Sequence, residues 1–294
     1  MQRFLQATAY GLLQGGLFAI VAVGFSLVWG VTNIVNLAHG ALVIIGAYVA
    51  WQLHSALGLD PTLGMLPAAA ILFASGYVIQ RGLVNRVVNA PIWMTLLVTF
   101  GLELLLVNLL LVGYTGNYRR IRTGWASRAL DIGGVRLPYG RLAGFGFAIL
   151  LTVLLVLFIT RTRTGLAIRA AGMDRGMARS MGVNIRHVYA VTFGIAAALA
   201  GAAGSIVGMT STFSPADAGH FTLQSFVIAV LGGLGNMWGA LAGGLLVGVV
   251  ESLGAQYVSG TLINAFAFGL LVLVLAIRPS GLLGRPFYEA RVET

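Results

Sequence analysis

Two long apolar runs are separated by the polar stretch Thr32-Asn33-Ile34-Val35-Asn36-Leu37-Ala38-His39-Gly40. Each run is long enough to cross a bilayer, and the stretch between them leaves no room for an ordinary loop. Helical spacing puts Asn33, Asn36 and His39 at i, i+3 and i+6, so we expect their side chains to share one face. Two interpretations follow. Either Thr32 or Asn36 caps the second run while His39 bonds to a neighbour, or the neutral polar groups line a pathway for a small polar solute.

The composition is that of a protein that crosses a membrane many times. Apolar residues make up 58% of the 294 residues and charged residues only 9%, against roughly 25% in soluble domains. Gly is frequent, with 41 residues, many of them inside the apolar runs, which predicts close packing of helices in lipid. We therefore expect an all-α, polytopic membrane protein of about 8–10 transmembrane helices, broken or re-entrant segments included. The expected organisation is a single transmembrane domain over residues 1–294.

Hydropathy and turn signals predict nine spans, which lie near residues 8–30, 37–57, 62–82, 93–113, 141–160, 188–209, 221–235, 237–254 and 261–278. The seventh and eighth are short and Gly-rich, so they form two half-helices, a re-entrant pair or a tight hairpin. Gly232, Gly233, Gly235 and Asn236 lie at this junction. These four residues either pack a hairpin or belong to the substrate pathway, since broken helices in transporters often mark the site.

Two long connectors, 114–140 and 161–187, are separated by one span and are expected on opposite sides of the membrane. The distribution of Arg places 161–187 and the C-terminus in the cytoplasm and the N-terminus outside. Apolar and Arg residues intersperse in 161–187, which predicts a short amphipathic helix pair, the second ended by Gly182. Such a pair is either an interfacial element among lipid headgroups or a docking element for a cytoplasmic partner.

The residue inventory excludes several functions. All 18 basic residues are Arg, and without Lys the chain lacks the phosphate-binding loop of ATPases. No Cys is present, and the four His residues are scattered singly, so neither a metal site nor a catalytic residue is expected. The net charge of +10 lies in short loops and the C-terminus, where anionic lipid rather than nucleic acid explains it.

Two carboxylates lie within the apolar spans. An ion-coupled secondary transporter usually relays its ion through such groups, so this class stays an alternative. Glu103 lies in the middle of a span and has either a role in gating or a structural hydrogen bond to a neighbouring helix. For Glu251, near the end of the eighth span, we expect a structural role.

Three separated blocks carry a resemblance to a known family. The first reads Asn36-Leu37-Ala38-His39-Gly40, followed by Gly46-Ala47-Tyr48. The second reads Thr164-Gly165-Leu166-Ala167-Ile168-Arg169-Ala170-Ala171, followed by Ala178-Arg179-Ser180-Met181-Gly182-Val183-Asn184. The third reads Gly232-Gly233-Leu234-Gly235-Asn236, followed by Gly239-Ala240 and Gly243-Gly244. Together they resemble the permease subunits of branched-chain amino acid ATP-binding-cassette (ABC) importers.

The resemblance implies an all-helical permease of the bacterial inner membrane. Its expected partners are a second, usually different permease subunit, two cytoplasmic ATPase subunits and an external substrate-binding protein. The connector 161–187 would then hold the helix that couples to the ATPase, with Arg169, Asp174, Arg179 and Gly182 as coupling residues. No cofactor is expected on this chain, and ATP and Mg would be bound by the ATPase partners. Branched-chain amino acids, urea and short amides are all candidate solutes.

Overall fold

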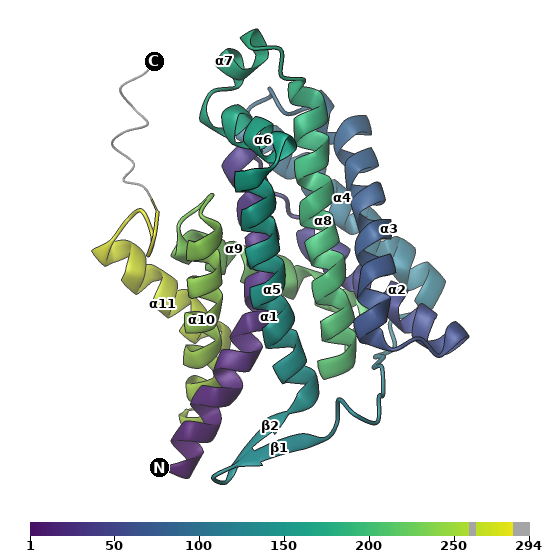
Figure 1. Cartoon of the computed structure of the whole chain (residues 1–294), viewed down its shortest axis with the longest axis vertical. Coiled ribbons are helices and arrows are strands. Elements are labelled where there is room, and N and C mark those ends of the chain that lie inside the picture. Colours follow the sequence, from purple (N-terminus) through teal and green to yellow (C-terminus); the bar gives the residue numbers. More distant parts are fainter. Residues whose placement is uncertain (259–262, 285–294) are drawn as a thin grey trace.

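The computed structural model describes residues 1–258 and 263–284, and most of them are helical. The long apolar helices are α1 (Gln2–Thr32), α2 (His39–Leu57), α3 (Pro61–Gly82), α4 (Ile92–Tyr114), α5 (Tyr139–Arg161), α8 (Ile185–Thr210), α9 (Ala218–Gly232), α10 (Met237–Tyr257) and α11 (Ile263–Ile277). The shorter elements are η1 (Val84–Arg86), β1 (Ala129–Ile132), β2 (Val135–Pro138), α6 (Arg163–Met173), α7 (Arg175–Ser180) and η2 (Pro215–Asp217). Figure 1 shows a helical bundle in which most of the long helices run roughly along its longest axis.

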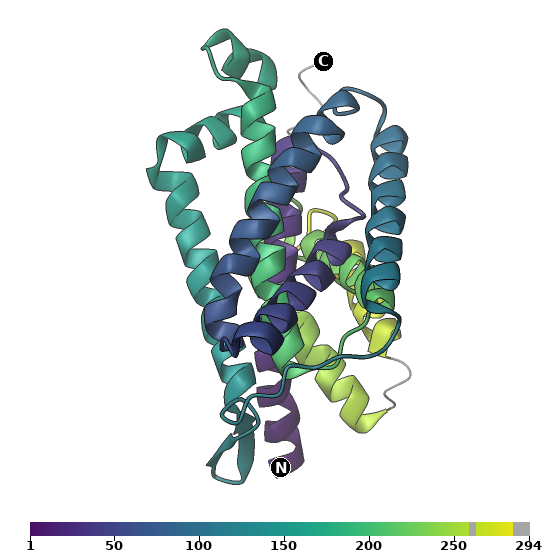
Figure 2. The same ribbon diagram turned by 90° about the vertical axis from the view of Figure 1, so that its right-hand side faces the viewer.

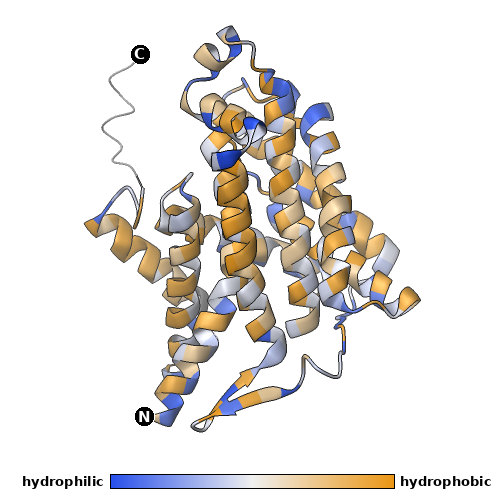
Figure 3. Ribbon diagram, in the orientation of Figure 1, coloured by the Kyte–Doolittle hydropathy of each residue, from blue (hydrophilic) through white to orange (hydrophobic). Residues whose placement is uncertain are grey.

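Each of the nine predicted spans coincides with one of the long helices. Seven of these helices are long and apolar enough to cross a membrane, while α9 and α11 have only 15 residues each. The first residues of the ninth predicted span, 261 and 262, lie outside the described residues. Figure 3 shows the apolar colouring over the helix bodies and hydrophilic residues at the two ends of the bundle. The described residues therefore form a multi-pass α-helical membrane protein.

Helices α1 and α8 form the centre of the bundle, and the most apolar part of each is largely buried. Helix α1 packs against α10, α8 and α5, while α8 packs against α3 and α2. The expected Gly-mediated packing is present between α1 and α10, where a Cβ on Gly15 would lie 2.6 Å from the Gly244 carbonyl oxygen. Backbones this close gain dispersion contacts that larger side chains would prevent.

The two long connectors lie at opposite ends of the bundle, as predicted (Figures 1 and 2). At one end, β1 and β2 form a hairpin next to the N-terminus, and the Gln6 amide exchanges two hydrogen bonds with the Arg136 backbone, at 2.8 and 2.7 Å. At the other end lie α6 and α7. The hairpin is a departure from the purely helical expectation. Gly133 and Gly134, both with positive φ, form its turn.

Candidate translocation site and coupling loop

The chain re-enters the bundle through a non-helical segment, residues 33–38, between α1 and α2. Helix α1 stops at Asn33, whose φ of 55° is left-handed and whose N–H bonds to the Trp29 carbonyl. Ile34 and Asn36 are then buried at 2% and 1% exposure before α2 begins. The predicted helical spacing across this stretch is therefore wrong, since the backbone leaves the helix at Asn33. As a result Asn33 is exposed, while Asn36 and His39 are buried.

The beginnings of α2 and α9 meet inside the bundle. The Gly40 N–H donates to the Thr222 hydroxyl oxygen at 2.9 Å, and the Thr222 hydroxyl donates to the Leu37 carbonyl at 2.8 Å. A Cβ on Gly40 would collide with the carbonyl oxygen of Ala218, so only Gly permits this approach. Thr222 was not among the sequence-predicted residues, because nothing local connects it to a segment 185 positions away.

Asn36 is buried without a partner for its side chain. Neither its Oδ1 nor its Nδ2 has a hydrogen-bond partner among the described residues. The N-cap of α2 is Ala38, with no side-chain hydrogen bond, so the interpretation that Asn36 caps α2 is wrong. The hydroxyl of Thr32 does not cap α2 either, because it bonds to the Val28 carbonyl of its own helix at 2.8 Å. Since an unmet buried amide group costs about 1–3 kcal/mol, this position favours a polar guest such as water or a solute.

His39 is fully buried but half satisfied. Its Nε2 lies 2.9 Å from the Val21 carbonyl oxygen. Because a carbonyl only accepts, Nε2 carries the proton in this arrangement. Its Nδ1 has no partner among the described residues, and the Phe25 ring packs edge-on against the imidazole with centroids 5.7 Å apart. The bond to Val21 agrees with the interpretation that His39 bonds α2 to a neighbouring helix. The Nδ1 atom remains a hydrogen-bond acceptor without a partner among the described residues, next to the helix break.

Helix α4 covers one side of the non-helical segment 33–38. The Thr99 hydroxyl donates to the Val35 carbonyl at 3.0 Å. One helical turn further, Glu103 is half-buried, and its Oε1 lies 3.9 Å from where a Cβ on Gly219 would sit, next to the start of α9. No hydrogen bond to Glu103 is present within the described part of the chain, so the hydrogen bond to a neighbouring helix required by the structural alternative is not observed here.

Glu251 differs from Glu103 in having a partner within the chain. The Gln224 amide donates to a carboxylate oxygen of Glu251 at 2.6 Å, so this pair joins α9 to α10. That contact agrees with the structural role expected for Glu251.

Gly232, Gly233, Gly235 and Asn236 form the turn of a hairpin between α9 and α10. The positive φ of Gly233 (101°) and Gly235 (83°) lets the chain reverse within these few residues. Asn236 uses its polar atoms locally, since Oδ1 caps α10 through the Gly239 N–H at 3.0 Å and Nδ2 donates to the Leu283 carbonyl at 2.6 Å. This geometry supports the hairpin interpretation, and their role in the substrate pathway stays a prediction.

The connector 161–187 folds into two short helices, each with a side-chain N-cap. Thr162 caps α6 through the Gly165 N–H at 3.0 Å, and Asp174 caps α7 through the Met177 N–H at 2.9 Å. Helix α7 ends in a Schellman motif, in which the Val183 N–H bonds to the Ala178 carbonyl and the Gly182 N–H bonds to the Arg179 carbonyl. The predicted helix pair and the Gly182 stop are therefore observed. The cap bond also assigns Asp174 a structural contact.

Helix α7 projects from the end of the bundle (Figure 1). Arg169 on α6 and Arg179 on α7 are both exposed. Three Met residues, at the end of α6, within α7 and directly after α7, are also strongly exposed, between 63% and 79%. They are Met173, Met177 and Met181. Flexible, polarisable Met side chains are common at protein-binding surfaces, and sequence reasoning noted them only as apolar residues of the connector.

Comparison with known proteins agrees with this architecture. Residues 7–275 match the family described as branched-chain amino acid transport system / permease component. The chain is 34% identical to the high-affinity branched-chain amino acid transport system permease protein BraD of Pseudomonas aeruginosa, over 97% of both chains. It is 32% identical to LivH of Escherichia coli, again over 97% of both chains. LivM of the same organism is 27% identical over 91% of this chain and 68% of its own length. A bundle of apolar helices with a buried helix break and full-length similarity to such permeases together show that this multi-pass inner-membrane protein belongs to the branched-chain amino acid permease family.

Proposed function

We propose that this chain forms the translocation pathway for a branched-chain amino acid or a related small polar solute in an ABC importer. The observation that carries the proposal is the buried helix break at residues 33–38, with the unpartnered amide of Asn36. The names of the relatives BraD and LivH support the solute class. Urea and short amides are alternative solutes, because a neutral amide and an imidazole suit any small polar guest.

The proposed pathway binds its solute weakly. Neutral groups such as the Asn36 amide exchange hydrogen bonds with a passing solute without the tight binding that would slow its release. An external binding protein would then set substrate identity. The energy would come from ATP and Mg bound to two cytoplasmic ATPase subunits, because this chain contains no Lys for a phosphate-binding loop. In this arrangement the connector 161–187 is the coupling loop of a single permease domain.

We infer that a second permease subunit covers the face formed by α4 and α9. Gly219 and His220 are exposed there and Glu103 is half-buried, although the rest of the exposed α4 surface is largely apolar. A carboxylate and an imidazole inside a membrane normally face protein or water, because lipid tails cannot solvate them. The similarity to both LivH and LivM supports a partner of the same fold, which would meet this face across a water-filled pathway.

Asn36→Leu tests the pathway in the reconstituted importer. The variant is nearly isosteric but removes both the carbonyl oxygen and the NH₂ group of the side-chain amide. We therefore expect solute uptake to fall at least about tenfold while the ATPase subunits still copurify. Asn108→Leu is the matched control, because Asn108 is exposed on α4 and, among the described residues, its amide bonds only to the Leu104 carbonyl of its own helix. Equal uptake by Asn36→Leu and wild type would exclude a role for Asn36 in the pathway.

Copurification separates the importer from an ion-coupled carrier. The importer predicts that ATPase subunits purify with the chain and that uptake stops without ATP. A secondary transporter predicts uptake by this chain alone in vesicles under a proton or sodium gradient, with Glu103 as the group to test. Uptake driven by a gradient in the absence of ATPase would contradict the proposal.

A further inference from the structure

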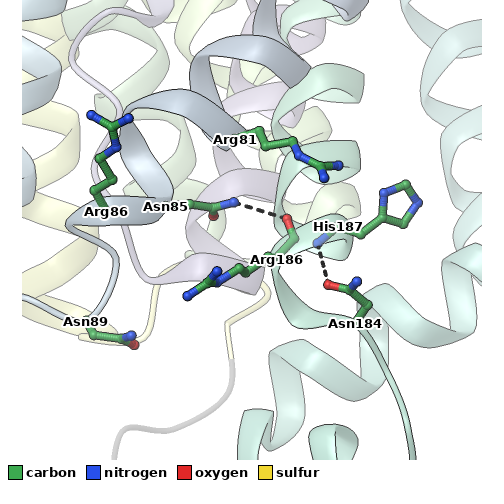
Figure 4. Close-up of a pocket in the computed structure, with 7 residues that line it drawn as sticks. All are labelled: Arg81, Asn85, Arg86, Asn89, Asn184, Arg186 and His187. Atoms are coloured by element: carbon green, nitrogen blue, oxygen red, sulfur yellow. Dashed lines mark hydrogen bonds between the residues drawn. The ribbon is translucent and has the colours of Figure 1, made fainter.

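A cavity of about 680 Å³ opens at the same end of the bundle as α7. Figure 4 shows that its walls come from the end of α3, from η1 and the turn after it, and from the start of α8. The lining residues are Arg81, Asn85, Arg86, Asn89, Asn184, Arg186 and His187. Every one of them is a cation, an amide or an imidazole, and none is a carboxylate. The cavity therefore has the chemistry of an anion site.

The walls are fixed in place by hydrogen bonds. The Asn85 amide donates to the Arg186 carbonyl at 3.2 Å, as drawn in Figure 4. The Tyr77 hydroxyl lies 3.0 Å from the His187 Nδ1 and accepts from Arg81 at 2.8 Å. These bonds hold η1 and α3 against the start of α8.

The guanidinium groups in this cavity have no acidic partner in the described structure. Within residues 1–258 and 263–284, the one ion pair joins Arg136 to Asp131. It lies in the β1–β2 hairpin, at the end of the bundle opposite to the cavity. The side chains of Arg86 and Arg186 make no hydrogen bond to other described residues and are exposed. Their planar donor forks are left available for an oxyanion, which they bind better than a point charge does.

The cavity lies where a membrane-spanning helix reaches the headgroup region. Arg81 lies in the last turn of α3 and His187 in the first turn of α8, and both helices are among the candidate spans. Directly below Arg81 on α3, Val78 is 66% exposed and Phe73 is 36% exposed. A lipid whose tails lie along this apolar surface would place its headgroup at the cavity.

We propose that the cavity binds the phosphate headgroup of an anionic phospholipid and thereby braces the coupling loop. The link to that loop is direct, since Arg175 at the start of α7 donates to the Asn89 Oδ1 at 3.2 Å, and the turn after α7 leads into Asn184. Anionic lipids gather at basic surfaces on the cytoplasmic leaflet, where each Arg contributes to the attraction.

The test uses the purified full-length chain with Arg86→Gln and Arg186→Gln combined. Neither side chain makes a hydrogen bond in the described structure, so we expect the variant to fold. Retained lipid is measured by native mass spectrometry after exchange into nanodiscs of phosphatidylglycerol and phosphatidylcholine. Wild type is expected to retain phosphatidylglycerol selectively, and the double variant to lose about fivefold in that selectivity for each Arg removed.

The matched control combines Arg122→Gln with Arg128→Gln, which removes the same charge from exposed positions in the connector at the opposite end. This control is expected to retain phosphatidylglycerol as wild type does. Equal losses in both double variants would reveal a general charge effect and overturn the site. Displacement of the lipid by inorganic phosphate alone would assign the cavity to a soluble anion. Unchanged lipid retention with lost ATPase copurification would make it a protein contact, and either result overturns the proposal.

Discussion

At the scale of single residues, Gly40 allows the close contact between α2 and α9. Its backbone lies against the first turn of α9, and the Thr222 hydroxyl bridges the Gly40 N–H and the Leu37 carbonyl. This one contact joins two helices that both begin inside the bundle. The buried amide of Asn36, which has no hydrogen-bond partner among the described residues, lies only a few residues away from this close backbone contact.

Gly40→Ala is therefore expected to destabilise the protein by about 1–3 kcal/mol, because the added methyl overlaps the Ala218 carbonyl and the backbones must separate. Thermal unfolding in detergent, followed by intrinsic fluorescence, measures the effect. Gly101→Ala is the control, since its Cβ would meet open space and Ala favours the α4 helix by about 1 kcal/mol. Equal shifts in unfolding temperature for both variants would show that the close contact at Gly40 does not contribute to the stability of the protein.

At the scale of elements, the connector 161–187, which we propose as the coupling loop, is a preformed structure rather than a flexible connection. Side-chain caps begin α6, α7 and α8, and a Schellman motif ends α7. Ile168 and Ala178 anchor the loop at 1% and 4% exposure, while Arg179 and Met177 face outward. A rigid projection of this kind transmits movement, because little is lost to local bending.

Arg179→Gln combined with Met177→Ser is expected to weaken binding of the ATPase subunits about tenfold or more, since it removes a charge and an apolar contact from the exposed surface of α7. Copurification of the complex at increasing salt measures the loss. Arg128→Gln, which removes one exposed charge at the other end of the bundle, is expected to leave assembly intact. A fully coupled complex in the double variant would rule out α7 as the coupling helix.

A side-chain hydrogen bond joins the connector 114–140 to the start of α3. The Asp60 carboxylate accepts from the Thr62 N–H at 3.0 Å and from the Trp125 indole N–H at 2.6 Å. Burial raises the pKa of Asp60, but the hydrogen bonds from Thr62 and Trp125 outweigh it, and the pKa lies below its ordinary value. Because the folded-state pKa is depressed, the stability gained is complete above the ordinary value and is lost as the pH falls through the folded one.

Asp60→Asn should accordingly remove part of the acid sensitivity of the unfolding temperature. Between pH 6 and about pH 3, we expect the wild type to lose stability through Asp60 while the variant lacks that contribution. Trp125→Phe is the companion variant, since it removes one of the bonds and should raise the pKa of Asp60. Identical pH profiles for wild type and Asp60→Asn would contradict this account.

At the scale of the whole molecule, the exposed surface of the helices differs in polarity from one side to another. Most exposed side chains of α3 and α5 are apolar and suit lipid tails, whereas the α4 and α9 face includes Glu103, Gly219 and His220. The proposed position of the pathway follows from this contrast, because only protein or water can cover a carboxylate at that depth.

Single Cys residues probe that contrast directly, because the natural chain contains no Cys. In the assembled importer, Gly219→Cys is expected to react at least about tenfold faster with a polar thiol reagent than Leu150→Cys on the exposed face of α5. Thiols ionise and react in water but stay inert in lipid. Mass spectrometry of the labelled chain gives both rates. Equal rates would place the α4 and α9 face in lipid.

The positions of the long helices were predictable because the length of an apolar run directly reflects the thickness of a bilayer. The helix break lies within the polar stretch where it was expected, but its non-helical backbone was not predicted, since that backbone is held by Thr99 and Thr222, which are remote in sequence. Local rules predicted the stop at Gly182 and missed the hairpin, although Gly133-Gly134 is a recognised two-residue turn signal. Asn36 and His39 stood out as polar interruptions, but only the folded chain separates them from Asn33.

The close contact of α1 with α10 has a consequence for biosynthesis. Gly11 and Gly15 leave the ribosome first, yet the glycines that they pack against, Gly244 and Gly248, emerge only when most of the chain has been made. At about 5–20 residues per second, α1 waits on the order of ten seconds or longer for its partner. Chains that stop before α10 leave the face of α1 that packs against α10 uncovered, so this helix contact is among the last to form during synthesis.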